Sequence, residues 1–176
     1  MFLVISCSLR PDSRSRVLAR LAYSHLRTMG DEVTYLDLAG YALPLCDDHD
    51  CYDHEHTRRV RAEIATATGV VLAAPIYNYD VSAATKNLVE LTGEAWTDKV
   101  VGFLCAAGDR SSYMSVMGLA NSLMLDFRCV ILPRFVYTTD ATFIDGRVHD
   151  PRVEERIAEL TRMLARITGA LQQPFA

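Results

Sequence analysis

Hydroxyl and guanidinium groups gather just after the first apolar run of the chain. Residues 6–16 contain four serines and three arginines, namely Ser6, Ser8, Ser13, Ser15, Arg10, Arg14 and Arg16. Hydroxyls, backbone N–H groups and a fixed arginine are the donors that bind a phosphate monoester. If a helix begins here, three cations at its positive end are unfavourable unless an anion binds. Two interpretations are open: an anion site, or a Ser/Asp helix cap with solvent-facing arginines. The segment has neither GxGxxG nor GxxxxGK[ST], so it indicates no Rossmann dinucleotide loop and no P-loop.

Thiol and imidazole groups form a second cluster further along the chain. Residues 46–56 include two cysteines and three histidines, which are Cys46, Cys51, His49, His54 and His56. These side chains suit zinc, but the spacings C-x4-C and H-x4-H-x-H match no compact structural zinc site. Acidic side chains also crowd the segment. The spacing favours a solvated acidic loop, and the alternative is a segment that senses a metal or a redox change.

The composition limits the class of protein. The 176 residues are 50% hydrophobic and 23% charged, with a net charge of −4. These values predict one globular domain over residues 1–176 and argue against disorder and against a basic nucleic-acid-binding surface. No apolar run approaches the roughly 20 residues that cross a bilayer, and the N-terminus lacks the basic region of a secretion signal. Five cysteines, an odd number, indicate reduced thiols, so we expect a cytoplasmic protein without membrane or nucleic-acid partners.

Apolar runs alternate with helical periodicity along the whole chain. The predicted strands are Phe2–Ser6, Val33–Leu38, Gly69–Ala74, Lys99–Cys105 and one within Arg128–Tyr137. The predicted helices are 17–26 with a stop at Gly30, 58–68, 82–92, 112–125 and 151–169 with a stop at Gly169. Segments 39–56, 75–81 and 106–111 are predicted to be irregular or loops. Continuous apolar strands that alternate with helices indicate a parallel sheet covered on both faces.

Five such βα units predict a flavodoxin-like, doubly wound α/β fold. Its five-stranded parallel sheet has the order 2-1-3-4-5, with helices on both faces. Ligands of these sheets bind beyond the carboxyl ends of the strands, where the strand order reverses. The loops at that point are residues 6–15, 75–82 and 106–112.

Two of these loops resemble motifs of the NADPH-dependent FMN reductase family. The run Ser8-Leu9-Arg10-Pro11-Asp12-Ser13 resembles its S-L-R-x-x-S phosphate loop. The run PIYNYDVSAATKN at 75–87 is similar to its P-E-Y-N-x-x-x-P-x-x-L-K-N segment. Both follow the expected strands, and the element order extends the resemblance over nearly the whole chain. The chain departs from the family at Cys7, Ile76 and Ser82, where Gly, Glu and Pro are usual, and its third loop matches in position only.

The resemblance implies an FMN site made by three loops. The implied phosphate ligands are Ser8, Arg10, Ser13 and Ser15. The implied neighbours of the flavin ring and ribityl chain are Pro75, Ile76, Tyr77, Asn78, Ala107, Gly108 and Ser111. No catalytic acid–base residue and no metal ligand is assigned, because hydride transfer between cofactors requires neither. Cys7 is expected to be a small buried side chain rather than a reactive thiol.

The implied activity is that of an FMN-dependent NAD(P)H oxidoreductase. NADPH or NADH would pass a hydride to bound FMN, and two electrons would then reach a quinone, an azo compound, a metal oxyanion or free flavin. One alternative is a flavodoxin-type FMN electron carrier without nicotinamide activity. A second alternative is a metal- or redox-sensing protein that uses Cys46–His56.

The fourth predicted helix suggests self-association. Its apolar residues cover much of its circumference and are Met114, Met117, Leu119, Leu123, Met124 and Leu125. A helix with such a wide apolar surface needs more cover than one sheet face provides. Together with the resemblance, this surface predicts a homodimer or a homotetramer.

Overall fold

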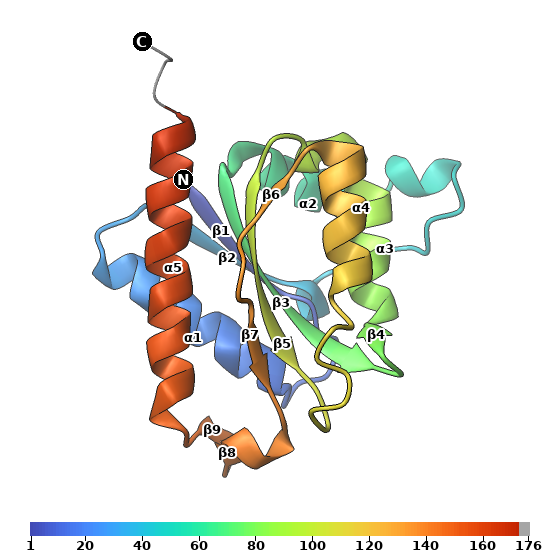
Figure 1. The fold of residues 1–176 in the computed structure, drawn as a ribbon. Coiled ribbons are helices and arrows are strands. Elements are labelled where there is room, and N and C mark those ends of the chain that lie inside the picture. The colour runs from blue at the N-terminus through green and yellow to red at the C-terminus, as the bar shows by residue number, and fades with distance from the viewer. Residues whose placement is uncertain (173–176) are drawn as a thin grey trace.

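A central parallel sheet organises the computed structural model, which describes residues 1–172 (Figure 1). The sheet order is β2-β1-β3-β5-β6. Strand β7 pairs with the second half of β5, on the same side as β6, so that β6 and β7 together form the fifth strand of the sheet. This arrangement is the predicted five-stranded 2-1-3-4-5 order, so the flavodoxin-like fold is confirmed. The main strands are β1 (Phe2–Ser6), β2 (Val33–Asp37), β3 (Gly69–Tyr77), β5 (Val100–Ala106), β6 (Val130–Ile131) and β7 (Val136–Thr138). The helices are α1 (Arg14–Thr28), α2 (Glu55–Thr66), α3 (Ala83–Thr92), α4 (Met117–Phe127) and α5 (Pro151–Leu171).

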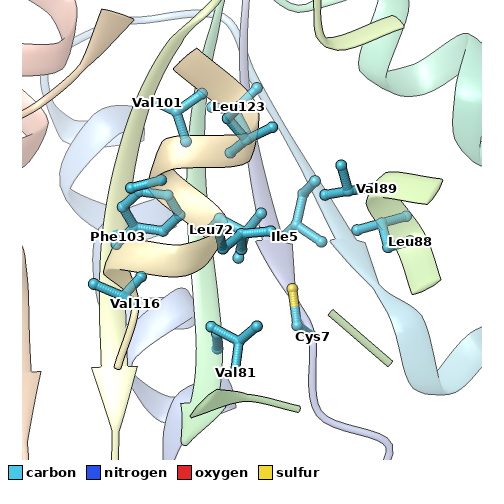
Figure 2. Packing of buried hydrophobic residues seen from close by; sticks show 14 of the residues in the cluster. Ile5, Cys7, Leu72, Val81, Leu88, Val89, Val101, Phe103, Val116 and Leu123 are labelled. Atoms are coloured by element: carbon cyan, nitrogen blue, oxygen red, sulfur yellow. The ribbon is translucent and has the colours of Figure 1, made fainter. Parts of the chain in front are cut away.

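The helices cover the sheet in two layers. Helices α1 and α5 pack on one face, and α2, α3 and α4 lie on the other (Figure 1). Successive side chains of a strand point to opposite faces, and both faces are covered, which explains why β1 is apolar from Phe2 to Ile5. Leu3 and Ile5 join the core under α2–α4, whereas Phe2 and Val4 join the core under α1 and α5. Figure 2 shows the first core, where Ile5, Leu72 and Phe103 lie beneath α3 and α4.

The register of the sheet brings four strand ends to one edge. Ser6 of β1 is opposite Ala73, Pro75 of β3 is opposite Ala106, and Ala106 of β5 is opposite Thr138. Because the strands are parallel, the loops that follow them open on the same side of the molecule.

The predicted loop at 75–81 is instead a β-hairpin. Strand β3 continues to Tyr77 and turns back into β4 (Asp80–Val81), with Ile76 opposite Val81. Asn78 and Tyr79 have φ values of 51° and 62°. Positive φ at both central residues is what a two-residue type I′ hairpin requires, and Asn adopts it readily. The loop prediction was wrong because Pro75 is accommodated within β3, which continues for two more residues to Tyr77.

Three boundary predictions were also wrong. The fourth helix begins at Met117, not at residue 112, because Ser112 instead makes a turn with Ser115 and a side-chain bond to Tyr137. The last strand is split into β6 and β7 by Pro133 and by Arg134, whose φ is 59°. Helix α5 passes through Gly169 and ends at Leu171, so this glycine is not a stop signal.

One further hairpin lies in a stretch for which no element was predicted. Strands β8 (Phe143–Ile144) and β9 (Arg147–Val148) pair antiparallel between β7 and α5. Figure 1 shows this hairpin at the same end of the molecule as the carboxyl ends of β5 and β7. Among residues 1–172, no helix combines the length and apolar character that crossing a membrane requires.

Candidate functional site

A cleft of about 490 Å³ lies at the carboxyl ends of the strands, where the fold predicts a ligand site. Four segments line it: residues from Arg10 to Ser15, residues 75–77, residues 106–108 and residues from Asp140 to Gly146. We call it the strand-end cleft. Its volume falls in the range of about 300–1,000 Å³ that is typical of small-molecule sites.

The N-terminus of α1 opens into this cleft without a side-chain cap. The N-cap residue Ser13 accepts no hydrogen bond from the helix, and the first turn has no acidic residue. The hydroxyl of Ser13 lies 2.7 Å from that of Ser15, and both residues are buried. The N–H of Arg16 donates to the carbonyl of Ser13 at 3.1 Å, whereas the structure of residues 1–172 gives no acceptor to the N–H groups of Arg14 and Ser15. These two N–H groups are therefore available to an anion, with two hydroxyls beside them.

Arg16 fixes the shape of the preceding loop. It is buried and makes two hydrogen bonds to Asp37, Nε to Oδ2 at 2.7 Å and Nη2 to Oδ1 at 3.0 Å. Its guanidinium also donates to the carbonyls of Ser8, Arg10 and Pro11. The bond to Asp37 raises the pKa of Arg16. Because its guanidinium already donates to Asp37 and to three carbonyls, Arg16 holds the loop rather than a ligand.

The other two arginines of the loop differ from Arg16. Arg14 pairs with Asp140, which ties the start of α1 to the segment before β8. Within residues 1–172, Arg10 has no ion-pair partner, and it lines the cleft. Of the three arginines, Arg10 is therefore the one whose charge remains available to an anion.

The β3–β4 hairpin and the loop that follows β5 form two further walls of the strand-end cleft. The side chain of Ile76 is buried, whereas Tyr77 is 55% exposed beside the cleft. Gly108 lines the cleft, and a Cβ atom built on it would meet nothing within 4 Å. The protein packing does not require glycine there, so the space beside Gly108 is available to a flat ligand.

Eight of the eleven predicted cofactor-binding residues line the strand-end cleft. They are Arg10, Ser13, Ser15, Pro75, Ile76, Tyr77, Ala107 and Gly108. The other three lie around it. Ser8 is buried, and its hydroxyl accepts the N–H of Arg10 at 3.2 Å. Asn78 is in the hairpin turn, and the Ser111 hydroxyl receives a bond from the Tyr79 hydroxyl at 2.8 Å.

Seven lining residues are not among the predicted eleven. Asp12, Arg14 and Ala106 lie in the loops that the fold already assigned to the site, whereas Asp140, Phe143, Asp145 and Gly146 come from the segment of the β8–β9 hairpin. An Asp-Gly pair between two short apolar–polar runs is a strong type I′ hairpin signal, and Asp145 and Gly146 have positive φ values of 47° and 72°. That signal could have revealed the hairpin, but not its place beside the cleft.

The histidines of the cluster at 46–56 make separate local contacts instead of converging on one point. The Nδ1 atom of His56 accepts the N–H of Ala42 at 2.7 Å, and His54 caps the start of α2. His49 is exposed beside Asp50. Within residues 1–172, no three His, Cys, Asp or Glu side chains are grouped to hold a metal ion.

Cys7 is buried at the end of β1, close to the cleft loop (Figure 2). Burial raises the pKa of its thiol to about 12, and burial likewise raises the pKa of Cys105 to about 12. Both thiols are therefore neutral near pH 7 and poor nucleophiles. This confirms that Cys7 is a small buried side chain.

Comparison with known proteins identifies the family. The model of the NADPH-dependent FMN reductase family matches residues 1–142. The chain belongs to the NADPH-dependent FMN reductase family. The match includes β1, the loop with Arg10 and Ser13, and the β3–β4 hairpin, and it ends before β8. Family members are oxidoreductases that use FMN or FAD with NAD(P)H.

One relative is similar in sequence, and two solved structures are similar in fold. The NAD(P)H-dependent FAD/FMN reductase of Geobacillus thermodenitrificans is 30% identical over 132 residues, which are 73% of this chain and 71% of the relative. The fold is similar to that of the flavoenzyme NAD(P)H:(acceptor) oxidoreductase FerB from Paracoccus denitrificans. That comparison has a TM-score of 0.78 and 18% identity over 96% of this chain and 97% of FerB. The apo form of the NADH:FMN oxidoreductase EMOB gives a TM-score of 0.74 and 14% identity over 93% and 89% of the two chains.

The residues of the strand-end cleft fit the flavin of this FMN reductase family. An uncapped helix N-terminus, two hydroxyls and the guanidinium of Arg10 are donors for a phosphate. The open space beside Gly108 and the exposed ring of Tyr77 suit the flat apolar part of the cofactor.

Proposed function

We propose that this chain binds FMN in the strand-end cleft and transfers electrons from NADPH or NADH to a small acceptor. The acceptor is a quinone, an azo compound, a metal oxyanion or free flavin. The single observation that carries the proposal is the α1 N-terminus, which has no capping side chain and no acidic first-turn residue. It lies beside Arg10, which has no carboxylate partner among residues 1–172. An anion there would satisfy donors that the protein itself leaves free.

Each group of site residues has a defined part in this proposal. Arg10, Ser13 and Ser15 hold the phosphate, and Ser8 supports the loop through the N–H of Arg10. Residues 75–78 and Ala107, Gly108 and Ser111 surround the flavin ring and its ribityl chain. Bound FMN would supply the two-electron chemistry, so the chain contributes binding, orientation and electrostatics rather than an acid–base residue.

A paired alanine variant tests the phosphate site. Arg10→Ala with Ser13→Ala should weaken FMN binding roughly a hundredfold or more, because each of the two hydrogen bonds to the charged phosphate contributes about 1.5–3 kcal/mol. Fluorescence titration with FMN measures the affinity. Arg20→Ala is the matched control, because Arg20 is exposed on α1 and does not line the cleft. Equal FMN affinity of the double variant and the wild type would refute the phosphate site.

The proposal also covers the domain organisation, the location and the oligomeric state of the protein. The whole chain, 1–176, forms one flavodoxin-like FMN-binding domain. Its five cysteines are free, and this supports a reducing, cytoplasmic location. The exposed apolar residues of α4 and the turn before it support a homodimer or homotetramer, and they are Met114, Met117, Met124 and Leu125.

A further inference from the structure

A second cavity of about 530 Å³ lies beside the strand-end cleft and is lined by cations. Arg110, Arg152 and Arg156 contribute to its wall together with a single acidic residue, Asp150. We call it the arginine cavity. Three arginines and one aspartate leave a formal surplus of two positive charges, although the chain as a whole has a net charge of −4. Such a concentration of positive charge in a concave site attracts an anion.

Two of these arginines are free to bind a ligand. Arg152 is neutralised by Asp150, through Nε to Oδ1 at 3.0 Å and Nη2 to Oδ2 at 2.8 Å. Arg110 and Arg156 have no carboxylate partner within residues 1–172. Arg156 donates from Nη2 to the carbonyl of Phe135 at 3.1 Å, and this bond holds its guanidinium at the cavity wall. A positioned guanidinium with unused donors is suited to a phosphate.

Aromatic rings form another part of the wall. Tyr113 stacks on Phe135 with ring centres 5.0 Å apart and meets Tyr137 edge-on at 5.3 Å. The Tyr137 hydroxyl donates to the carbonyl of Asp109 at 2.8 Å and lies 2.6 Å from the Ser112 hydroxyl, so its ring is fixed. Aromatic faces beside phosphate-binding arginines are suited to a nucleotide, because a purine can pack on the rings.

The arginine cavity and the strand-end cleft share two walls. Residues 106–108 line the cleft, and Arg110 and Tyr113 of the same loop line the cavity. On the other side, Asp140 and Phe143 line the cleft, whereas Thr139 and Thr142 line the cavity. A long ligand can therefore place one end at each site.

A third hollow has the opposite charge. The groove between the 46–52 loop, α3 and α4 is lined by Lys86 and by four acidic residues, namely Asp48, Glu90, Glu94 and Asp126. Its surplus of negative charge repels phosphates. The arginine cavity is therefore the better of these two sites for an anionic group.

We propose that the arginine cavity binds the adenosine 2′-phosphate end of NADPH. Arg110 and Arg156 hold the phosphate, and Tyr113 and Tyr137 contact the adenosine. The inference rests on the proposed function, since the nicotinamide end must reach the flavin in the strand-end cleft. It assigns a preference for NADPH over NADH, because NADH has no 2′-phosphate.

Calorimetry on the FMN-loaded protein tests this site apart from turnover. The probe is adenosine 2′,5′-bisphosphate, and adenosine 5′-monophosphate is the comparison compound because it lacks the 2′-phosphate. The wild type should bind the bisphosphate at least about tenfold more tightly. Arg110→Ala with Arg156→Ala should abolish that difference, and the single exposed variant Arg110→Glu should weaken binding without affecting the fold. Equal binding of the two probes by the wild type, or unchanged binding by the variants, would overturn the proposal.

Steady-state kinetics provides the second reading. The double variant should raise the KM for NADPH by about tenfold to a hundredfold and leave the KM for NADH within about twofold. Arg162→Ala is the control, because Arg162 is exposed on α5 and does not line the cavity. Equal increases for both nucleotides would contradict recognition of the 2′-phosphate. Failure of the proposed function would be seen differently: FMN would not bind, or neither nucleotide would reduce it. Calorimetry on the purified protein would still decide whether the arginine cavity binds the bisphosphate.

Discussion

Arg16 and Asp37 are joined by two parallel hydrogen bonds, of 2.7 and 3.0 Å, between α1 and the end of β2. The same guanidinium donates to the carbonyls of Ser8, Arg10 and Pro11. One buried side chain therefore connects the sheet to the loop that leads to the uncapped helix N-terminus. The loop has its shape before any ligand binds, and this reduces the entropy lost on binding.

Arg16→Met should weaken both the fold and the site. It leaves Asp37 unpaired and three carbonyls without their donor, and the side chains of the pair are only 9% and 29% exposed. We expect a loss of about 2–3 kcal/mol in the free energy of unfolding and roughly tenfold weaker FMN binding. Urea unfolding and FMN titration measure the two effects.

The control for this prediction is Arg128→Met. Arg128 pairs with Asp98 through two bonds of 2.9 Å, but the side chains are 67% and 65% exposed. Exposed pairs contribute about 0–1 kcal/mol. Equal destabilisation by both variants would show that the burial of the Arg16 pair is unimportant.

Gly108→Leu should fill the ligand space and leave the fold unchanged. A Cβ on Gly108 meets nothing within 4 Å, so the free energy of unfolding should change by less than about 0.5 kcal/mol. FMN binding should weaken about tenfold or more, because the new side chain competes with the flavin ring. Gly40→Leu is the matched control, since it also has open space but does not line the cleft. Normal FMN binding by Gly108→Leu would place the ring elsewhere.

Asp145→Asn should strengthen FMN binding. The strand-end cleft is lined by Arg10 and Arg14 but also by three carboxylates, Asp12, Asp140 and Asp145. Removal of one negative charge near a bound phosphate should raise the affinity by about twofold to fivefold at low salt, and high salt should remove the gain. Asn tolerates the positive φ of 47° at this position, so the hairpin should persist. Weaker binding would show that the Asp145 carboxylate itself contacts the ligand.

The fold could be predicted further than the site. Buried parallel strands are apolar without interruption, so β1, β3 and β5 were visible in the sequence, and their order followed from the alternation with helices. The boundaries of the helices were less predictable, because tertiary contacts determine them. Ser112 bonds to Tyr137, 25 residues away, and this contact delays the start of α4.

The site was predictable where a loop follows a strand directly. Arg10 and Ser13 lie in the loop between β1 and α1, and Gly108 follows β5, so the fold alone brings them to the same end of the sheet. The roles of the neighbouring arginines were not predictable, because Arg16 pairs with Asp37 and Arg14 with Asp140 only in the folded chain. The arginine cavity likewise depends on the distance between a loop and the start of α5.

The buried thiols should make the protein less stable at high pH. The pKa values of Cys7 and Cys105 rise from 9.0 to about 12 in the folded chain. Between these values the unfolded chain has lost the proton that the folded chain keeps, so stability is complete below about pH 9 and falls as the pH rises toward 12. Each thiol contributes a slope of up to about 1.4 kcal/mol per pH unit. Urea unfolding of Cys7→Ala across this range should show a shallower slope, and an unchanged slope would contradict the assignment.

The exposed apolar residues of α4 should mediate self-association. Leu125 is 77% exposed, so Leu125→Lys should not disturb the core. It should shift a dimer or tetramer toward the monomer in size-exclusion chromatography with light scattering, because a buried lysine is unfavourable at an interface. Leu45→Lys is the control, since Leu45 is 79% exposed outside α4. A wild-type monomer, or an unchanged oligomer of Leu125→Lys, would exclude this surface.

The anaerobic addition of NADPH to the FMN-loaded protein tests the central claim most directly. The visible absorbance of the flavin, followed by stopped flow, should disappear in a rapid phase whose rate depends on the NADPH concentration, and a quinone should restore it. A protein that binds FMN but keeps its absorbance under NADPH and NADH would be an electron carrier of the flavodoxin type. A protein that binds no FMN at all would contradict the whole account.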